Sequence, residues 1–132
     1  MDTTPEALRA RLAALIEAPP PPRLLVRPDP PDPRIAEAPF QALVVDVARW
    51  LGWTCYHTRD SRGSDPGWPD LVLARPVGTR GCRLLYRELK RERGRLTTEQ
   101  ARWGELLLRA GCDWAVWRPN QWSEILDVLT TG

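Results

Sequence analysis

Two short strand-like runs near the middle of this 132-residue chain restrict its fold more than any other feature. The first covers residues 71–74 and the second covers residues 84–90. The segment between them contains two glycines, at positions 78 and 81. Runs of this kind on either side of a glycine-containing turn predict two paired antiparallel strands.

Charged residues stand at defined positions on this predicted pair of strands. Alternation along a strand sends Glu88 and Lys90 to one face and Leu89 to the other face, into the core. Asp70 opens the first run, so pairing of the strands brings it to the same patch as Glu88. Two carboxylates with an ammonium group beside them form a metal site with a charged helper.

Lysine occurs once in the chain: of the 19 Lys and Arg residues, only Lys90 is a lysine. Wherever a positive surface charge suffices, the sequence uses arginine. A compact ammonium on a flexible stem differs chemically from a planar guanidinium, which does not readily lose a proton. The lone lysine beside two acids therefore favours a chemical role, with chance in an arginine-rich chain as the alternative.

Hydrophobic periodicity and capping residues predict the rest of the domain. Helical spacing recurs over residues 40–51, 97–110 and 120–129, and β-prone runs cover residues 53–58 and 113–118. Thr97 and Gln100 have the spacing of a capping box. The resulting order is α-β-β-β-α-β-α, with a βαβ crossover and parallel strands at residues 83–117. The predicted fold class is α/β, a mixed central sheet flanked by helices.

We interpret residues 1–33 as an appendage and residues 34–132 as the domain. Residues 3–18 have the apolar stripe of an amphipathic helix, and the proline-rich segment after them predicts a semi-rigid spacer. No apolar run approaches the ~20 residues of a transmembrane helix, and the N-terminus lacks a signal-peptide pattern, so we expect a cytoplasmic protein without a membrane partner. The three cysteines are far apart, which predicts buried thiols and neither a zinc site nor disulfides.

Longer motifs extend the pattern around the two acids. Pro69-Asp70 followed by Glu88-Leu89-Lys90 resembles the PD-(D/E)xK signature of the restriction-endonuclease-like nucleases. The whole string is similar to the VRR-NUC subfamily, especially its small stand-alone members in phages and prophages, over residues 37–129. Its motifs are Gly67-Trp68-Pro69-Asp70-Leu71, Glu88-Leu89-Lys90, Gly94-Arg95-Leu96-Thr97 and Glu99-Gln100.

The resemblance implies a restriction-endonuclease-like core and a metal-dependent DNA endonuclease, as a flap- or branch-selective enzyme of a bacterial or phage-infected cell. Mg²⁺ or Mn²⁺ would be bound by Asp70, Glu88 and the backbone carbonyl of Leu89. Lys90 would orient the attacking water or stabilise charge on the phosphate. Small members that act on junctions are typically homodimers, so a homodimer is one expected assembly.

Two further residues of the predicted catalytic set follow from the resemblance. Gln100 borders the active site in this subfamily, and its alternative role is to cap the helix together with Thr97. Glu37, just before the first core helix, takes the place where relatives carry an acid near the metal. Gln41, one helical turn later, is the rival for that role, whereas we expect Asp46 to face solvent.

Basic residues suggest where DNA would bind. From Arg75 to Arg95 there are eight basic residues and only two acids, with a solvated charged face as the alternative reading. His57 and the polar loop after it carry side chains that commonly contact phosphates, although a lone histidine is usually structural. The predicted DNA-contacting residues are His57, Arg59, Ser61, Arg62, Ser64, Arg91, Arg93 and Arg95.

Two other functions compete with the nuclease. One is a non-catalytic nucleic-acid-binding domain with the same basic surface, and the intact set of Asp70, Glu88 and Lys90 argues against it. The other is a protein-interaction module with Trp117 and Trp122 as surface anchors.

Overall fold

A computed structural model describes residues 2–16, 26–58 and 62–131 of the chain. Its four-stranded sheet has the order β1-β2-β3-β4, formed by Thr54–His57, Leu71–Val77, Gly81–Leu89 and Asp113–Trp117. The pairs β1–β2 and β2–β3 are antiparallel, and β3–β4 is parallel. The mixed sheet and the parallel crossover confirm the predicted fold class and the predicted central hairpin.

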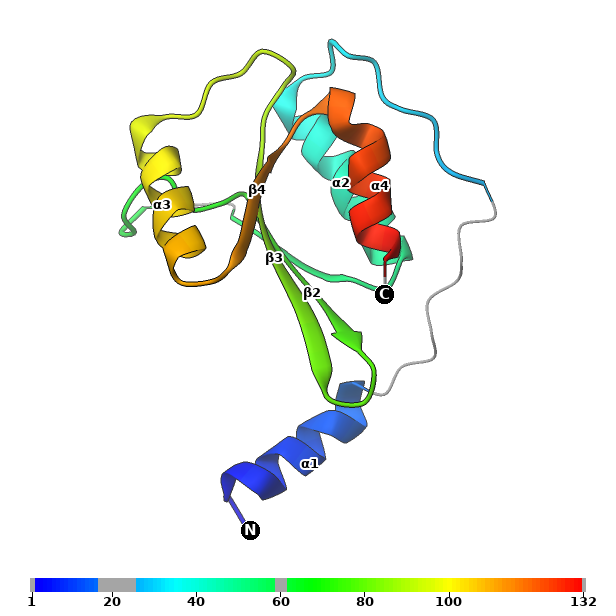
Figure 1. Cartoon of the computed structure of the whole chain (residues 1–132), viewed down its shortest axis with the longest axis vertical. Coiled ribbons are helices and arrows are strands. Elements are labelled where there is room, and N and C mark those ends of the chain that lie inside the picture. Colours follow the sequence, from blue (N-terminus) through cyan, green and yellow to red (C-terminus); the bar gives the residue numbers. More distant parts are fainter. Residues whose placement is uncertain (1, 17–25, 59–61, 132) are drawn as a thin grey trace.

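Helices cover both faces of the sheet (Figure 1). On one face lie α2 (Glu37–Trp50) and α4 (Trp122–Thr130), which follows a short 3-10 turn, η1 (Pro119–Gln121); on the other lies α3 (Thr98–Arg109). The main core fills the layer between the sheet and the α2–α4 pair, with members that include Phe40, Val44, Leu71, Leu73, Leu85, Leu89, Ile125 and Leu129. Alternate strand positions supply this core, so Glu88 lies on the α3 face.

The start of α3 has the predicted capping box. Thr97 Oγ1 accepts a hydrogen bond from Gln100 N at 3.1 Å, and Gln100 Oε1 accepts one from Thr97 N at 2.9 Å. Further along, Gly104 lets the helix lie close on β4, because a Cβ there would lie 2.5 Å from the Trp114 ring. These two features set where the first turn of α3 lies above the sheet.

Two arginines of the β2–β3 hairpin hold the end of α4. Arg75 Nη1 donates to Leu129 O at 2.9 Å, and Arg83 Nη1 donates to Val128 O at 2.8 Å. Both guanidinium groups also stack over Trp53, at 4.7 and 5.5 Å from the ring centroid. Cations satisfy the carbonyls left free at a helix C-terminus, so these two arginines serve the fold and not a nucleic-acid surface.

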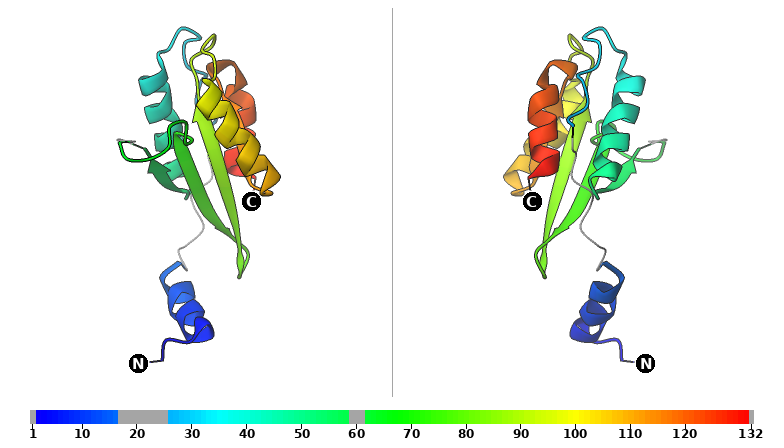
Figure 2. Two further views of the ribbon diagram at one scale, coloured as in Figure 1. Left: turned by 90° about the vertical axis from the view of Figure 1, so that its left-hand side faces the viewer. Right: turned by 90° about the vertical axis from the view of Figure 1, so that its right-hand side faces the viewer.

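Part of the predicted appendage contacts the domain. Arg27 pairs with Asp127 at 2.9 Å, and Trp122 Nε1 donates to Pro28 O at 2.9 Å, so the chain before α2 crosses α4. Helix α1 (Pro5–Ile16) lies beyond the β2–β3 hairpin in Figure 2, and its three leucines are exposed. The polyproline run lies outside the described residues. No helix in the described part of the chain is long and apolar enough to cross a membrane.

Burial corrects two expectations from the sequence. Trp117 and Trp122 are 3% and 4% exposed, so they are core residues and not surface anchors. Trp117 on β4 and Trp122 on α4 both belong to the main core. The sequence alone does not specify which face of the strand or of the helix is covered. Cys55 and Cys112 are partly buried, but Cys82 is exposed because it lies beside the hairpin turn.

Candidate active site

The two predicted carboxylates meet where β2 begins and β3 ends. The antiparallel register pairs Leu71 with Arg87, and one further step along both strands sets Asp70 opposite Glu88. Asp70 Oδ2 accepts a hydrogen bond from the backbone N–H of Leu89 at 2.8 Å. The register of the hairpin therefore brings together both acids and the backbone of Leu89.

Gln100 reaches the same place from α3. Its side-chain Nε2 donates to Glu88 Oε1 at 2.9 Å, while its Oε1 caps the helix at Thr97. The two roles that the sequence left open for Gln100 are therefore compatible, because the amide group uses its oxygen for the cap and its nitrogen for Glu88.

Glu88 is strongly perturbed for a carboxyl group. It is 1% exposed. Burial, which is the largest cause, acts together with the hydrogen bond and charge of Asp70 to raise its pKa to about 9, whereas the charge of Lys90 opposes the shift. When both carboxylates are ionised, Glu88 Oε2 is buried without a donor among the described residues. Either a proton shared with Asp70 or a cation relieves this arrangement.

Lys90 lies two residues after Glu88, just past the end of β3. It is 9% exposed, and its Nζ lies 3.8 Å from Glu37 Oε1. Glu37 lies inside the first turn of α2 and not before the helix, which corrects the expectation. Pro39 permits this early start, because the N–H that proline lacks has no intrahelical partner in a first turn.

The helix residues considered alongside Glu37 have different surroundings. Gln41 is partly buried one turn along α2, and no hydrogen bond joins its side chain to Lys90 or Glu88 in the described part of the molecule. Asp46 is exposed, as expected. Of these three side chains, Glu37 is the one with an ion pair to the site.

The residues just before Asp70 join the strand to α3. Gly67 has φ +95°, and a Cβ there would lie 2.4 Å from the carbonyl carbon of Glu99, so only glycine lets the two backbones approach this closely. The Trp68 ring contacts Trp103 of α3 edge-on, with centroids 4.9 Å apart. This contact sets the position of Asp70 relative to Gln100. Gly67 and Trp68 were not among the predicted site residues, and their signal was their place in the motif.

The donor set fits a hard divalent cation. Asp70, Glu88 and the Leu89 carbonyl are all oxygen ligands, which Mg²⁺ and Mn²⁺ prefer. Such a cation would satisfy the buried Oε2 of Glu88, which has no hydrogen-bond partner in the part of the chain that the structure describes. The described residues contain no group of three His, Cys, Asp or Glu side chains placed to hold a metal. Water or phosphate oxygens would therefore complete the coordination, as is usual for Mg²⁺.

The predicted DNA-contacting residues separate into three groups. Residues 91–96 form a loop that we call the basic turn, and Arg91, Arg93 and Arg95 are all exposed on it. Arg62 and Ser64 are exposed on the loop before β2, and Arg59 and Ser61 lie outside the described residues.

His57, the remaining predicted contact, pairs with Leu71 in the sheet. Strand alternation therefore places its side chain on the core face, as for Cys55, opposite to the face of Glu88. The long basic stretch from Arg75 to Arg95 likewise contains both buried and exposed side chains. Arg75 and Arg87 are buried, and the exposed cations near Lys90 belong to the basic turn.

The model of the VRR-NUC domain family matches residues 39–120. A solved structure described as a VRR_NUC domain has a TM-score of 0.56 and 22% identity, over 69% of this chain and 94% of its own. A second, described as a VRR_NUC domain protein, has a TM-score of 0.56 and 21% identity, over 74% of this chain and 91% of its own. No curated protein matches the sequence.

Proposed function

We propose, from the premise that this chain belongs to the VRR-NUC family of nuclease-type domains, that it is a metal-dependent DNA endonuclease that hydrolyses phosphodiester bonds. One observation carries the proposal. The Asp70 and Glu88 carboxyl groups share one site, where the pKa of Glu88 is raised to about 9 and no donor among the described residues reaches its Oε2. A cation bound here would relieve the strain on the ionised acids, which supports the proposal.

Each residue then has a distinct role in hydrolysis. Asp70, Glu88 and the Leu89 carbonyl would hold Mg²⁺ or Mn²⁺, which when bound polarises the phosphate and activates water. Gln100 orients the Glu88 carboxylate through its 2.9 Å hydrogen bond. Lys90, held beside Glu37 of α2, donates to the attacking water or to a phosphate oxygen.

Glu37 would hold the Lys90 ammonium in place. Their 3.8 Å separation is long for a hydrogen bond but short enough for electrostatic attraction, which solvent weakens in part because the Glu37 side chain is about half exposed. The Lys90 ammonium is thereby held between Glu37 and Glu88. This reading makes Glu37 a positioning residue and leaves the metal to the residues of the hairpin.

DNA is the proposed substrate because of the basic turn beside Lys90. Its three exposed arginines offer phosphate contacts, which supply affinity and salt dependence without base specificity. No described feature singles out a DNA sequence. We therefore propose selection by the shape of flapped or branched DNA, by a cytoplasmic enzyme of a bacterial or phage-infected cell.

The test is a cleavage assay on plasmid, flap and four-way-junction DNA. We expect cutting with Mg²⁺ or Mn²⁺, none with EDTA, and none with the Asp70→Asn protein under either condition. The control is Asp46→Asn, which removes an exposed carboxylate from α2 and should cut at the wild-type rate. Cutting in EDTA, or full activity of Asp70→Asn, would contradict the proposal. DNA binding without any cutting would instead support the non-catalytic alternative.

A further inference from the structure

The basic turn has little internal structure to give it a shape. Among the described residues, its backbone makes one hydrogen bond within residues 91–96, from Gly94 N to Arg91 O at 3.0 Å. A loop with so few bonds of its own depends on the groups around it for a defined conformation. The arginines of the basic turn can bind a phosphate backbone in register only if that conformation is defined.

Arg118 supplies this order from the end of β4. Its Nη1 atom lies within hydrogen-bonding distance of three carbonyl oxygens of the basic turn: Arg91 O at 3.0 Å, Glu92 O at 3.3 Å and Gly94 O at 2.6 Å. Hydrogen bonds from a charged guanidinium are stronger than those between neutral groups. Three carbonyl groups of the basic turn therefore point toward one guanidinium nitrogen.

Arg118 is itself held in place beside the catalytic strand. Its backbone N–H donates to Gln121 Oε1 at 2.9 Å, which ties it to the start of α4. The residue before it, Trp117, pairs with Leu89 in the parallel ladder, and its carbonyl accepts from Lys90 N at 3.0 Å. Arg118 therefore connects the basic turn to the same backbone that carries Lys90.

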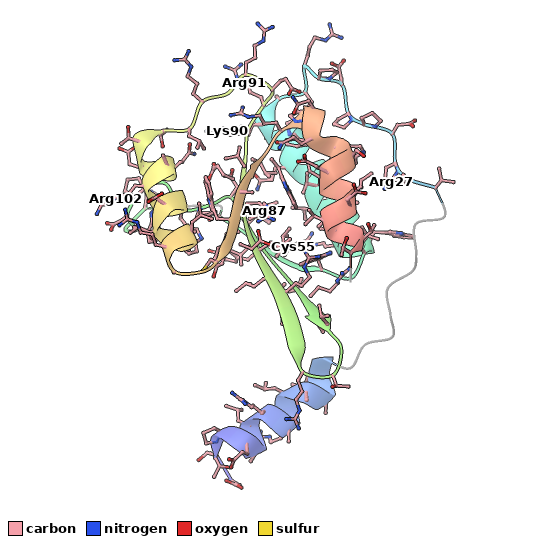
Figure 3. The ribbon with its side chains drawn as sticks, viewed as in Figure 1. Arg27, Cys55, Arg87, Lys90, Arg91 and Arg102 are labelled. Atoms are coloured by element: carbon pink, nitrogen blue, oxygen red, sulfur yellow. The ribbon has the colours of Figure 1, made fainter. Side chains whose placement is uncertain are left out.

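The basic turn presents its backbone to Arg118 and its arginine side chains to solvent. The carbonyls of Arg91, Glu92 and Gly94 face Arg118, and the side chains of Arg91, Arg93 and Arg95 on the same turn are exposed. Figure 3 shows Arg91 and Lys90 at the same end of the molecule, away from the β2–β3 hairpin turn. A Cβ on Gly94 would lie 3.5 Å from Lys90 Cδ, so the loop also packs near the lysine stem.

We propose that Arg118 is the positioning residue of the DNA-binding surface: it shapes the basic turn so that its arginines bind successive phosphates together. This inference rests on the DNA-binding part of the proposed function and not on cleavage. The competing account is that Arg118 is simply one more phosphate contact. The two accounts differ in whether the slope losses of two substitutions add. If Arg118 positions the arginines, its removal already removes their contribution, whereas two independent phosphate contacts would be lost additively.

The test measures binding of labelled duplex DNA in EDTA, where no cleavage is needed, as a function of salt concentration. Each lost phosphate contact lowers the slope of log K against log salt by about 0.9. We expect Arg118→Ala to lower the slope by about 2.7 units, about 0.9 for each of the three arginines, because the order of the whole turn is lost. We also expect Arg91→Ala to have little further effect in the Arg118→Ala background.

Arg83→Ala is the matched control. Arg83 also donates to backbone carbonyls, Val128 O and Thr131 O, but it lies seven residues before Lys90 on β3, roughly 23 Å away along the strand. Its removal disturbs a similar tether without touching the basic turn. The salt slope of Arg83→Ala should therefore equal that of the wild type. An equal loss in both variants would show general loosening of the fold and overturn the proposal.

Trypsin digestion of the folded protein gives a readout without DNA. We expect cleavage within the basic turn to be at least ~10-fold faster in Arg118→Ala than in wild type or Arg83→Ala, because the loop opens more often. Unchanged cleavage there, or a slope loss of about one unit that adds fully to that of Arg91→Ala, would overturn the positioning role. Failure of the wild type to cut DNA would count only against the proposed function.

Discussion

Replacing Glu88 with glutamine should stabilise the metal-free protein, although it removes a carboxylate that the proposed chemistry needs. Burial beside Asp70 raises the pKa of Glu88 to about 9, so at neutral pH the folded protein carries a proton there that the unfolded chain lacks. A glutamine has the shape of the protonated side chain. Its oxygen can accept from Gln100 and its amide can donate toward Asp70 without any proton uptake.

The size of the effect follows from the pKa. The ordinary value for glutamate is 4.5, so at pH 7 the wild type must protonate a group 2.5 pH units above that value in order to fold. At ~1.4 kcal/mol per unit the cost is about 3 kcal/mol, an upper figure because the site can relax. Between the two pKa values the folded state binds more protons, so stability falls as pH rises from about 5 to about 9.

The assay is urea unfolding in EDTA at several pH values between 5 and 9, for wild type, Glu88→Gln and the exposed-site control Asp46→Asn. The stability advantage of Glu88→Gln should grow from under ~1 kcal/mol at pH 5 to about 3 kcal/mol at pH 7. Asp46→Asn should follow the wild-type curve. Added Mn²⁺ should stabilise the wild type and not Glu88→Gln, because only the former retains both carboxylates.

Two results would refute this reasoning. A Glu88→Gln protein that is no more stable than wild type at pH 7 would mean that Glu88 is ionised in the folded state without strain. A pH dependence that is the same in both proteins would mean that some other group carries it. Either result would also remove the observation on which the metal site rests.

Three further perturbations address other parts of the site. Lys90→Arg keeps the charge, but a guanidinium is wider and planar. The variant should therefore bind DNA and cut it at least ~10-fold more slowly than wild type. Cutting at the wild-type rate would show that Lys90 contributes charge alone. Gly67→Ala forces a Cβ against the α3 backbone at a φ of +95° and should lower stability by about 2 kcal/mol in urea unfolding, with an unchanged midpoint contradicting the close approach. Replacing Arg91 and Arg95 together with alanine should reduce the salt slope of DNA binding by about two units, and an unchanged slope would place the DNA elsewhere.

Much of the fold could be predicted from the sequence, because its signals are local. The alternation that sends Leu89 into the core and Glu88 to the α3 face depends only on strand geometry, and the structure bears it out. The capping box at Thr97 likewise needs only residues three apart. Even the meeting of Asp70 and Glu88 follows from one hairpin register. These features involve neighbours in sequence, so the chain specifies them before it packs.

Other parts of the site were decided only by tertiary structure. The ion pair of Glu37 with Lys90 depends on where α2 begins and how it packs, and Gln100 reaches Glu88 because α3 lies close on β4. The roles of the arginines likewise depend on tertiary structure. Arg83 and Arg118 look alike in sequence, yet one caps a helix and the other shapes the basic turn.

The physical reason is that a long charged side chain carries no periodic signal of its own. Its partners are set by which backbone carbonyls the packed elements leave within reach, and those carbonyls lie 24 to 27 residues away for Arg118 and 45 to 48 residues away for Arg83. By itself the sequence determined the strands, the helices and the acids of the site. Packing of the helices on the sheet decided which charged residues serve the fold and which remain to meet a substrate.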